Sequence, residues 1–509
     1  MTRRDRALET LRQHSELADL AAFPFGFDLD RAEHVEAVRL ASGTALQAVA
    51  GDDTGGTYFL CSNGEVLYAG SDGEAGLVGD SVDEALEVLI GLPGWRDYTD
   101  LDLQAGTAEL TAVIARTEET IRNSYAPQLD HDRSRLLAGL GLSRLPQLEL
   151  VRRLHQSLLR TEPDFMLLNA DEGCAYTLLD RLPRPPLWRT VLAPGQADLL
   201  MLRSDRTCWD EVVDDPGRRA TLLRSAQYDR RTTDLPLLRT LLRAEAQLGH
   251  TQELTLAAVL VGLHGHVQDY ELMQSLRMAD SDVHHALGGF PEGAEGLRAW
   301  ATAFDVSNYG QDPTDEDALT WADLARRQGR TELARSVLVR LLDDAGPRDA
   351  PLLGRLAGQL ATLGDYTQAA RARKLHASLQ DDPEQRGALT LSLAVLQRRA
   401  GDVEAAWQSL QRAVAVLDGP PPEPPTDQLA LDLDLDEQEC QAVAWRSLQL
   451  GQMVTEEHFL VARAAATTGL AATARTALAA GTAVMGTLTR PTDNLRGLAH
   501  AMTEESEGW

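Results

Sequence analysis

Three evenly spaced glycines in the second half of the chain constrain its fold more than any other feature. Gly329, Gly364 and Gly401 lie 35 and 37 residues apart, and each stands five residues before an alanine. Glycine permits the tight turn between two helices, and a small residue lets the second helix approach the first closely. A period of about 34 residues is typical of arrays of antiparallel helix pairs. The spacing therefore predicts three stacked helix pairs over about residues 315–420.

These three units resemble the tetratricopeptide (TPR) repeat family. The segments that carry the likeness are Gly329-Arg330-Thr331-x-x-Ala334, Gly364-Asp365-Tyr366-x-x-Ala369 and Gly401-Asp402-Val403-x-x-Ala406. Pro347, Pro383 and Pro420 stand where the units would end. A helical solenoid buries contacts between neighbouring repeats and leaves a long concave surface open, which suits a protein segment as ligand.

Further helices are predicted on both sides of the repeats. Upstream, short apolar-periodic segments over 237–248, 253–263 and 270–279 indicate helix pairs that are HEAT-like or degenerate TPR-like. Downstream, a proline-rich linker is followed by helices that we expect to cap the array, over 436–450, 455–468 and 471–480.

The amino-terminal region has β character. Two apolar runs, 56–61 and 65–69, flank Ser62-Asn63-Gly64, and Asn-Gly is a strong hairpin signal because both residues tolerate positive φ. A third strand is expected near 74–78. Ser81 and Glu84 then form a capping box that predicts the start of a helix, which Leu92-Pro93-Gly94 ends.

This region resembles the SUKH superfamily of bacterial immunity and scaffold-like proteins. The likeness rests on Gly51 to Tyr58, Val66-Leu67-Tyr68, Glu74-Ala75-Gly76 and the stretch from Val82 to Pro93. The resemblance implies an α+β sheet that binds other proteins and carries no catalysis.

The predicted fold class is an α+β amino-terminal domain followed by a mostly α helical-repeat solenoid. Between them, helical periodicity near 136–159 precedes a second strand pair, 165–168 and 174–179. The predicted division is a SUKH-like domain 1–105, a mixed α/β extension or second small domain 106–215, helices 216–314, TPR-like repeats 315–420, a linker 421–426 and a helical cap 427–509.

The charge balance narrows the class of partner. Lys and Arg total 48 against 77 Asp and Glu, a formal net charge of −29. Such a chain repels phosphate backbones and anionic lipid, so we expect neither a nucleic acid nor a membrane as partner. A basic protein is the favoured partner. The sequence leaves the oligomeric state open.

The cysteines and the apolar stretches predict a cytoplasmic protein. Cys61, Cys174, Cys208 and Cys440 are far apart and form no C-x-x-C pair, which suits a reducing compartment. The longest uncharged apolar stretches are shorter than the roughly 18 residues that a membrane helix needs. The amino terminus predicts an amphipathic helix rather than a signal peptide.

We expect no catalytic residue, cofactor or metal. His264, His266, His284 and His285 are close in sequence, but adjacent or i, i+2 histidines on a helix point in different directions. Asp432-x-Asp434-x-Asp436 begins like a calcium loop, yet Glu437 occupies the position that needs glycine. The acidic start of a helix explains these aspartates better.

The resulting hypothesis is a non-catalytic protein-binding protein. Its α+β domain, its solenoid groove or both would bind a partner, and the SUKH resemblance implies a basic toxin domain with this chain as immunity factor or inhibitor. The alternative is a regulatory scaffold or adaptor in signalling or stress response, and a metal-dependent enzyme is the weakest alternative. The candidate protein-binding residues are the acids and aromatics of the first domain that we expect to be exposed: Asp52, Asp53, Tyr58, Asp72, Glu74 and Trp95.

Overall fold

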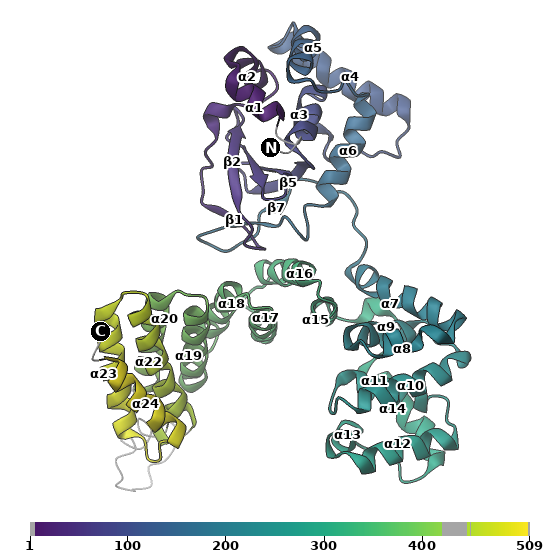
Figure 1. The fold of residues 1–509 in the computed structure, drawn as a ribbon, viewed down its shortest axis with the longest axis vertical. Coiled ribbons are helices and arrows are strands. Elements are labelled where there is room, and N and C mark those ends of the chain that lie inside the picture. Colours follow the sequence, from purple (N-terminus) through teal and green to yellow (C-terminus); the bar gives the residue numbers. More distant parts are fainter. Residues whose placement is uncertain (1–5, 420–444, 448, 507–509) are drawn as a thin grey trace, which may run out of the picture. The chain divides into compact units, whose positions relative to one another are not determined.

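The structure is a computed structural model that describes residues 6–419, 445–447 and 449–506. It divides into two compact units, Met1–Leu167 with Tyr176–Val337, and Leu168–Ala175 with Leu338–Trp509. The five-stranded sheet lies in the first unit, and the described residues after it are mainly helical (Figure 1). The predicted fold class, an α+β domain followed by a helical-repeat region, is therefore confirmed. The finer division into six segments stays a prediction.

An antiparallel meander forms the sheet of the first unit. Its strands are β2 (Leu46–Gly51), β3 (Thr57–Cys61), β4 (Val66–Ala69) and β5 (Glu74–Gly79). Thr57 pairs with Ala69 and Leu60 with Val66, so the hairpin at Ser62-Asn63-Gly64 is confirmed. Gly64 has a φ of +103°, the conformation that this turn requires.

The second predicted strand pair forms in part around its turn, and one of its strands also joins the first sheet. β7 (Thr177–Leu178) joins the sheet parallel to β5, which extends the first sheet. Outside the named strands, Leu168 and Ala175 form an isolated antiparallel bridge around the turn. The remaining short strands are β1 (Val38–Leu40) and β6 (Leu167–Asn169).

Helices pack on the meander and share its core. Ser81 Oγ accepts a hydrogen bond from the Glu84 N–H at 3.2 Å, which confirms the predicted start of α3. The α3 and α6 helices both contact β5. The helices of this region are α1 (Arg6–Gln13), α2 (Ser15–Ala22), α3 (Val82–Gly91), α4 (Thr107–Ser124), α5 (Leu129–Leu140) and α6 (Gln147–Leu159).

A second helical region of the first unit has its own core around α11, whose residues are almost all buried. Its first helix begins at Leu187, directly after the N-cap residue Pro186. The helices are α7 (Leu187–Ser204), α8 (Trp209–Val213), α9 (Pro216–Tyr228), α10 (Leu235–Ala246), α11 (Gln252–Gly262), α12 (Val267–Ala279), α13 (Ser281–Ala286), α14 (Leu297–Asn308) and α15 (Ala318–Arg327).

The repeat glycines lie at helix turns, as predicted. Gly329, Gly364 and Gly401 have φ of +74°, +79° and +88°. The alanine that follows each of them is at most 1% exposed, so these small residues pack at helix contacts. The helices of this region after Gly329 are α16 (Thr331–Asp343), α17 (Ala350–Thr362), α18 (Tyr366–Ser378), α19 (Pro383–Arg399) and α20 (Val403–Leu417).

Three helices follow in the described part of the second unit. They are α22 (Gln449–Thr467), α23 (Ala471–Thr487) and α24 (Asp493–Ser506), and they share a core with α19 and α20. Pro420, the linker 421–426, the Asp432-x-Asp434-x-Asp436 motif and most of the predicted helix 436–450 lie outside the described residues.

Candidate functional site

The structure separates the six predicted binding residues into two groups. Asp53, Asp72 and Glu74 are exposed on the turns and strand ends of the meander. Asp52, Tyr58 and Trp95 are buried, with 7%, 1% and 5% of their surfaces exposed. The expectation that all six are exposed is therefore corrected for three of them. The roles of all six residues in binding stay predictions.

Asp52 is buried because it organises the turn between β2 and β3. Its Oδ1 accepts hydrogen bonds from the Thr54 N–H at 2.9 Å, the Thr54 hydroxyl at 2.8 Å and the Gly56 N–H at 2.9 Å. Its Oδ2 accepts a bond from the Tyr68 hydroxyl at 2.8 Å. Burial favours the neutral acid, but the bonds from Tyr68, Gly56 and Thr54 outweigh it and lower the pKa of Asp52.

The aromatic side chains around Asp52 form a packed cluster. The ring of Tyr68 lies 5.0 Å from that of Tyr58 and 5.2 Å from that of Trp95, and the Trp95 indole N–H donates to the Tyr58 hydroxyl at 3.3 Å. Arg96 donates to the Tyr68 hydroxyl at 2.9 Å. Burial raises the pKa of Tyr68, with the Asp52 charge adding to the shift. The cluster is thus a hydrogen-bonded core with its polar groups occupied.

The histidines that suggested a metal lie in local pairs. The rings of His264 and His266 stack 6.3 Å apart, and those of His284 and His285 meet edge to face at 5.8 Å. Within the described residues, no group of three His, Cys, Asp or Glu side chains could hold a metal ion.

The repeat helices hold a short segment of the chain by its main chain. This segment, Leu168–Ala175, belongs to the second unit. Gln368 of α18 donates to the Gly173 carbonyl at 2.7 Å in a buried bond, and Arg371 donates to the same oxygen at 3.3 Å. Asp343 of α16 accepts the Ala175 N–H at 2.9 Å. The three side chains thus bind two backbone groups that lie two residues apart, the Gly173 carbonyl and the Ala175 N–H.

Close packing and an ion pair fix the geometry of this contact. Arg371 pairs with Asp343 at 2.6 Å and also donates to the Cys174 sulfur at 3.0 Å. Gly173 has a φ of +75°, and a Cβ there would lie 3.4 Å from Arg371 Cδ and 3.5 Å from Gln368 Nε2. The flanking acids Asp171 and Glu172 are exposed. The helices therefore bind the turn through its backbone and leave its charged side chains in solvent.

Sequence reasoning found part of this contact. The strands 165–168 and 174–179 on either side of this turn were predicted, and so were the helices that carry Gln368 and Arg371. Their meeting was not, because the contacts join residues almost 200 positions apart. One signal was present in the sequence: Gln368 is a polar residue beside the small repeat residue Ala369, and it is fully buried. A buried amide needs a hydrogen-bond partner.

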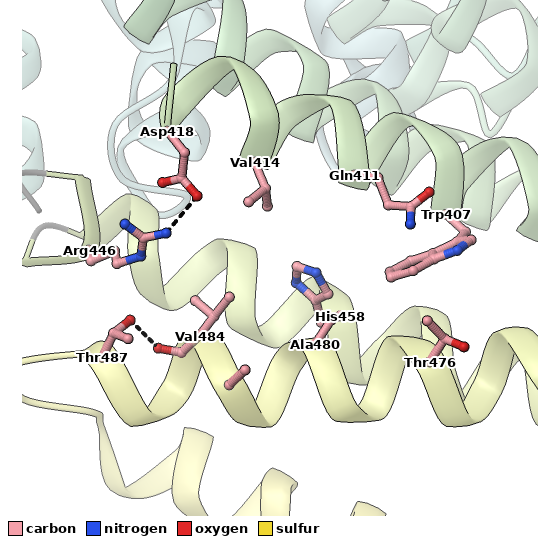
Figure 2. Close-up of a pocket in the computed structure, with 11 residues that line it drawn as sticks. Trp407, Gln411, Val414, Asp418, Arg446, His458, Thr476, Ala480, Val484 and Thr487 are labelled. Atoms are coloured by element: carbon pink, nitrogen blue, oxygen red, sulfur yellow. Dashed lines mark hydrogen bonds and ion pairs between the residues drawn. The ribbon is translucent and has the colours of Figure 1, made fainter. Parts of the chain in front are cut away.

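A pocket lies between α20, α22 and α23 of the same unit (Figure 2). It has a volume of about 450 Å³, and its walls are mostly apolar. Trp407 borders it on one side, and the buried His458 lies in its middle. At the other end Arg446 donates to Asp418 at 2.6 Å, so this end holds a neutralised ion pair.

Comparison with known proteins finds no relative. No family model, no curated protein and no solved structure matches the chain. In the described part of the chain, no helix has both the length and the apolar character that crossing a bilayer requires. The contacts within the molecule itself are therefore the basis for a proposed function.

Proposed function

We propose that this chain is a non-catalytic protein-binding protein whose helical repeats bind a segment of a partner. One observation carries the proposal: α16 and α18 hold Leu168–Ala175 through its main-chain carbonyl and N–H. Recognition of the backbone depends little on side-chain identity, so the same groups suit other segments with a similar turn. The open face of a helical array offers such groups along its length.

Charge supports a basic partner. The net charge of −29 attracts cationic proteins at long range and repels nucleic acids. The exposed Asp53, Asp72 and Glu74 place part of this charge on the meander. The TPR-like spacing supports a protein partner, and the SUKH-like amino-terminal pattern favours a basic toxin domain with this chain as its immunity factor or inhibitor.

The test is affinity purification of the full chain with mass spectrometry, followed by calorimetry with the purified partner. One variant, Gln368→Ala with Arg371→Ala, removes the side chains that bind the Gly173 carbonyl. Its control is Gln408→Ala with Arg412→Ala, which changes the same residue types at exposed positions of α20.

A second variant tests the amino-terminal domain. It combines Asp53→Asn, Asp72→Asn and Glu74→Gln, which removes three exposed negative charges from the meander. The charge-matched control, Asp19→Asn with Glu109→Gln and Glu119→Gln, removes three exposed charges from helices of the same region.

The proposal expects a basic partner whose affinity falls at least about tenfold in one of the two variants and stays unchanged in its control. Loss in the Gln368 and Arg371 variant assigns the site to the repeats, and loss in the acid variant assigns it to the meander. A partner that binds all four proteins equally contradicts both sites. If the purified partner is a signalling protein and not a toxin, the result favours the scaffold alternative.

A further inference from the structure

The pocket between α20, α22 and α23 has the size and lining of a small-molecule site. Its volume of about 450 Å³ falls within the range of ligand pockets, roughly 300–1,000 Å³. Val414 of α20 and Ala480, Ala483 and Val484 of α23 give it apolar walls. The Trp407 indole adds an aromatic surface at one side (Figure 2). A flat apolar molecule complements such walls.

His458 gives the pocket one directional polar group. Its side chain is 2% exposed, and its Nδ1 lies 2.8 Å from the Val454 carbonyl. A carbonyl only accepts, so Nδ1 carries the proton and Nε2 carries a lone pair. Burial also lowers the pKa of His458, which keeps the ring neutral. Among the described residues, no side chain or backbone group donates to Nε2.

The His458 ring lines the pocket. Figure 2 shows the His458 ring between Trp407 on one side and Val484 on the other, in the space between α20 and α23. The ring meets the Trp407 indole edge to face at 5.8 Å. Nε2 is an acceptor to which no described protein group donates, so a ligand that supplies an N–H or O–H can bond to it from the pocket.

Charge at the far end excludes strongly ionic ligands. Asp418 accepts hydrogen bonds from the Trp445 indole N–H at 2.9 Å and from Arg446 at 2.6 Å. This carboxylate is therefore already neutralised, and a ligand carboxylate or ammonium would find no uncompensated countercharge there.

We propose that this pocket binds a small, neutral, planar aromatic molecule with one hydrogen-bond donor, of the indole or phenol class. The ring packs between Trp407 and the apolar residues of α23, and the donor bonds to His458 Nε2. This activity is separate from the proposed partner binding, because the pocket shares no residue with the site on α16 and α18.

The test is titration of the full chain with two isomeric probes, 3-methylindole and 1-methylindole, followed by saturation-transfer NMR or calorimetry. The isomers have the same size and apolar surface, but only 3-methylindole keeps the N–H. The proposal expects saturable binding of 3-methylindole at millimolar or lower concentration, and about tenfold weaker binding of 1-methylindole.

Two variants of α23 locate the binding. Ala483→Leu places a larger side chain in the pocket, and Ala479→Leu makes the same change at an exposed position outside it. We expect Ala483→Leu to weaken 3-methylindole binding at least tenfold and Ala479→Leu to leave it unchanged. Equal affinity for the two isomers, equal binding by the two variants, or no binding of either probe at about 1 mM overturns the proposal.

Discussion

The hydroxyl of Tyr68 stabilises the amino-terminal domain through Asp52. Tyr68→Phe removes the bond to Asp52 Oδ2, to which no other described residue donates, while Oδ1 keeps the bonds from Thr54 and Gly56. Arg96 loses its acceptor in the same step. A hydrogen bond to a charged group contributes about 1.5–3 kcal/mol, so we expect a loss of about 2 kcal/mol. If the predicted binding role of Asp52 were correct instead, the change would affect a partner and leave stability intact.

The assay is hydrogen–deuterium exchange of the β3 and β4 amides, which reports the free energy of opening in that part of the sheet. A double-mutant cycle with Asp52→Asn isolates the bond between the two side chains. The control, Tyr125→Phe, changes a tyrosine that is 50% exposed, and we expect an effect below about 0.5 kcal/mol.

Two outcomes would refute this reasoning. A Tyr68→Phe loss below about 0.5 kcal/mol would mean that the hydroxyl does not hold the carboxylate. A coupling energy near zero between Asp52→Asn and Tyr68→Phe would mean that the loss, whatever its size, has another source.

Three further changes test the packing of both units by urea unfolding. A Cβ at Gly56 would lie 2.0 Å from the Tyr68 hydroxyl, so Gly56→Ala should destabilise by at least about 2 kcal/mol; a neutral result would contradict the packing. Gly358 is exposed within α17 and has nothing near its Cβ position, so Gly358→Ala should stabilise by about 0.5–1 kcal/mol, and destabilisation would contradict its position. Burial lowers the folded pKa of His458 below 6.5, so the unfolded chain protonates first as the pH falls, and stability decreases from about pH 6.5 down to the folded pKa. The stability advantage of the native chain over His458→Phe should therefore shrink between pH 7.5 and 5.5, and a constant difference would show that His458 is not buried neutral.

Local patterns in the sequence predicted the elements of the fold well. Asn63-Gly64 fixed the hairpin because its turn chemistry acts over a few residues, and Ser81 with Glu84 located the start of α3 for the same reason. The repeat glycines marked helix turns because positive φ is a property of a single residue.

Burial and long-range contacts were harder to predict. Asp52 stands in a stretch typical of a solvated turn, and its burial follows from the approach of Tyr68 from β4, two strands further along the chain. The strand 174–179 was predicted, but its pairing with β5 was not, because β5 lies far from it in the sequence. Gln368 binds the Gly173 carbonyl, and His458 lines the pocket between α20, α22 and α23. Both positions depend on how helices pack, which no local sequence pattern specifies.

The most direct test of the proposed function is whether the repeats bind the Leu168–Ala175 segment when it is supplied as a separate peptide. The host is the full chain with Gly173→Val, because a β-branched residue resists the φ of +75° and its Cβ would crowd Gln368 and Arg371. NMR titration with the blocked peptide of residues 168–175 should give a Kd of about 0.1–1 mM, and adding Gln368→Ala to the host should abolish the binding. Failure of the peptide to bind, or equal binding without the Gln368 side chain, would contradict recognition of a main-chain segment by these helices.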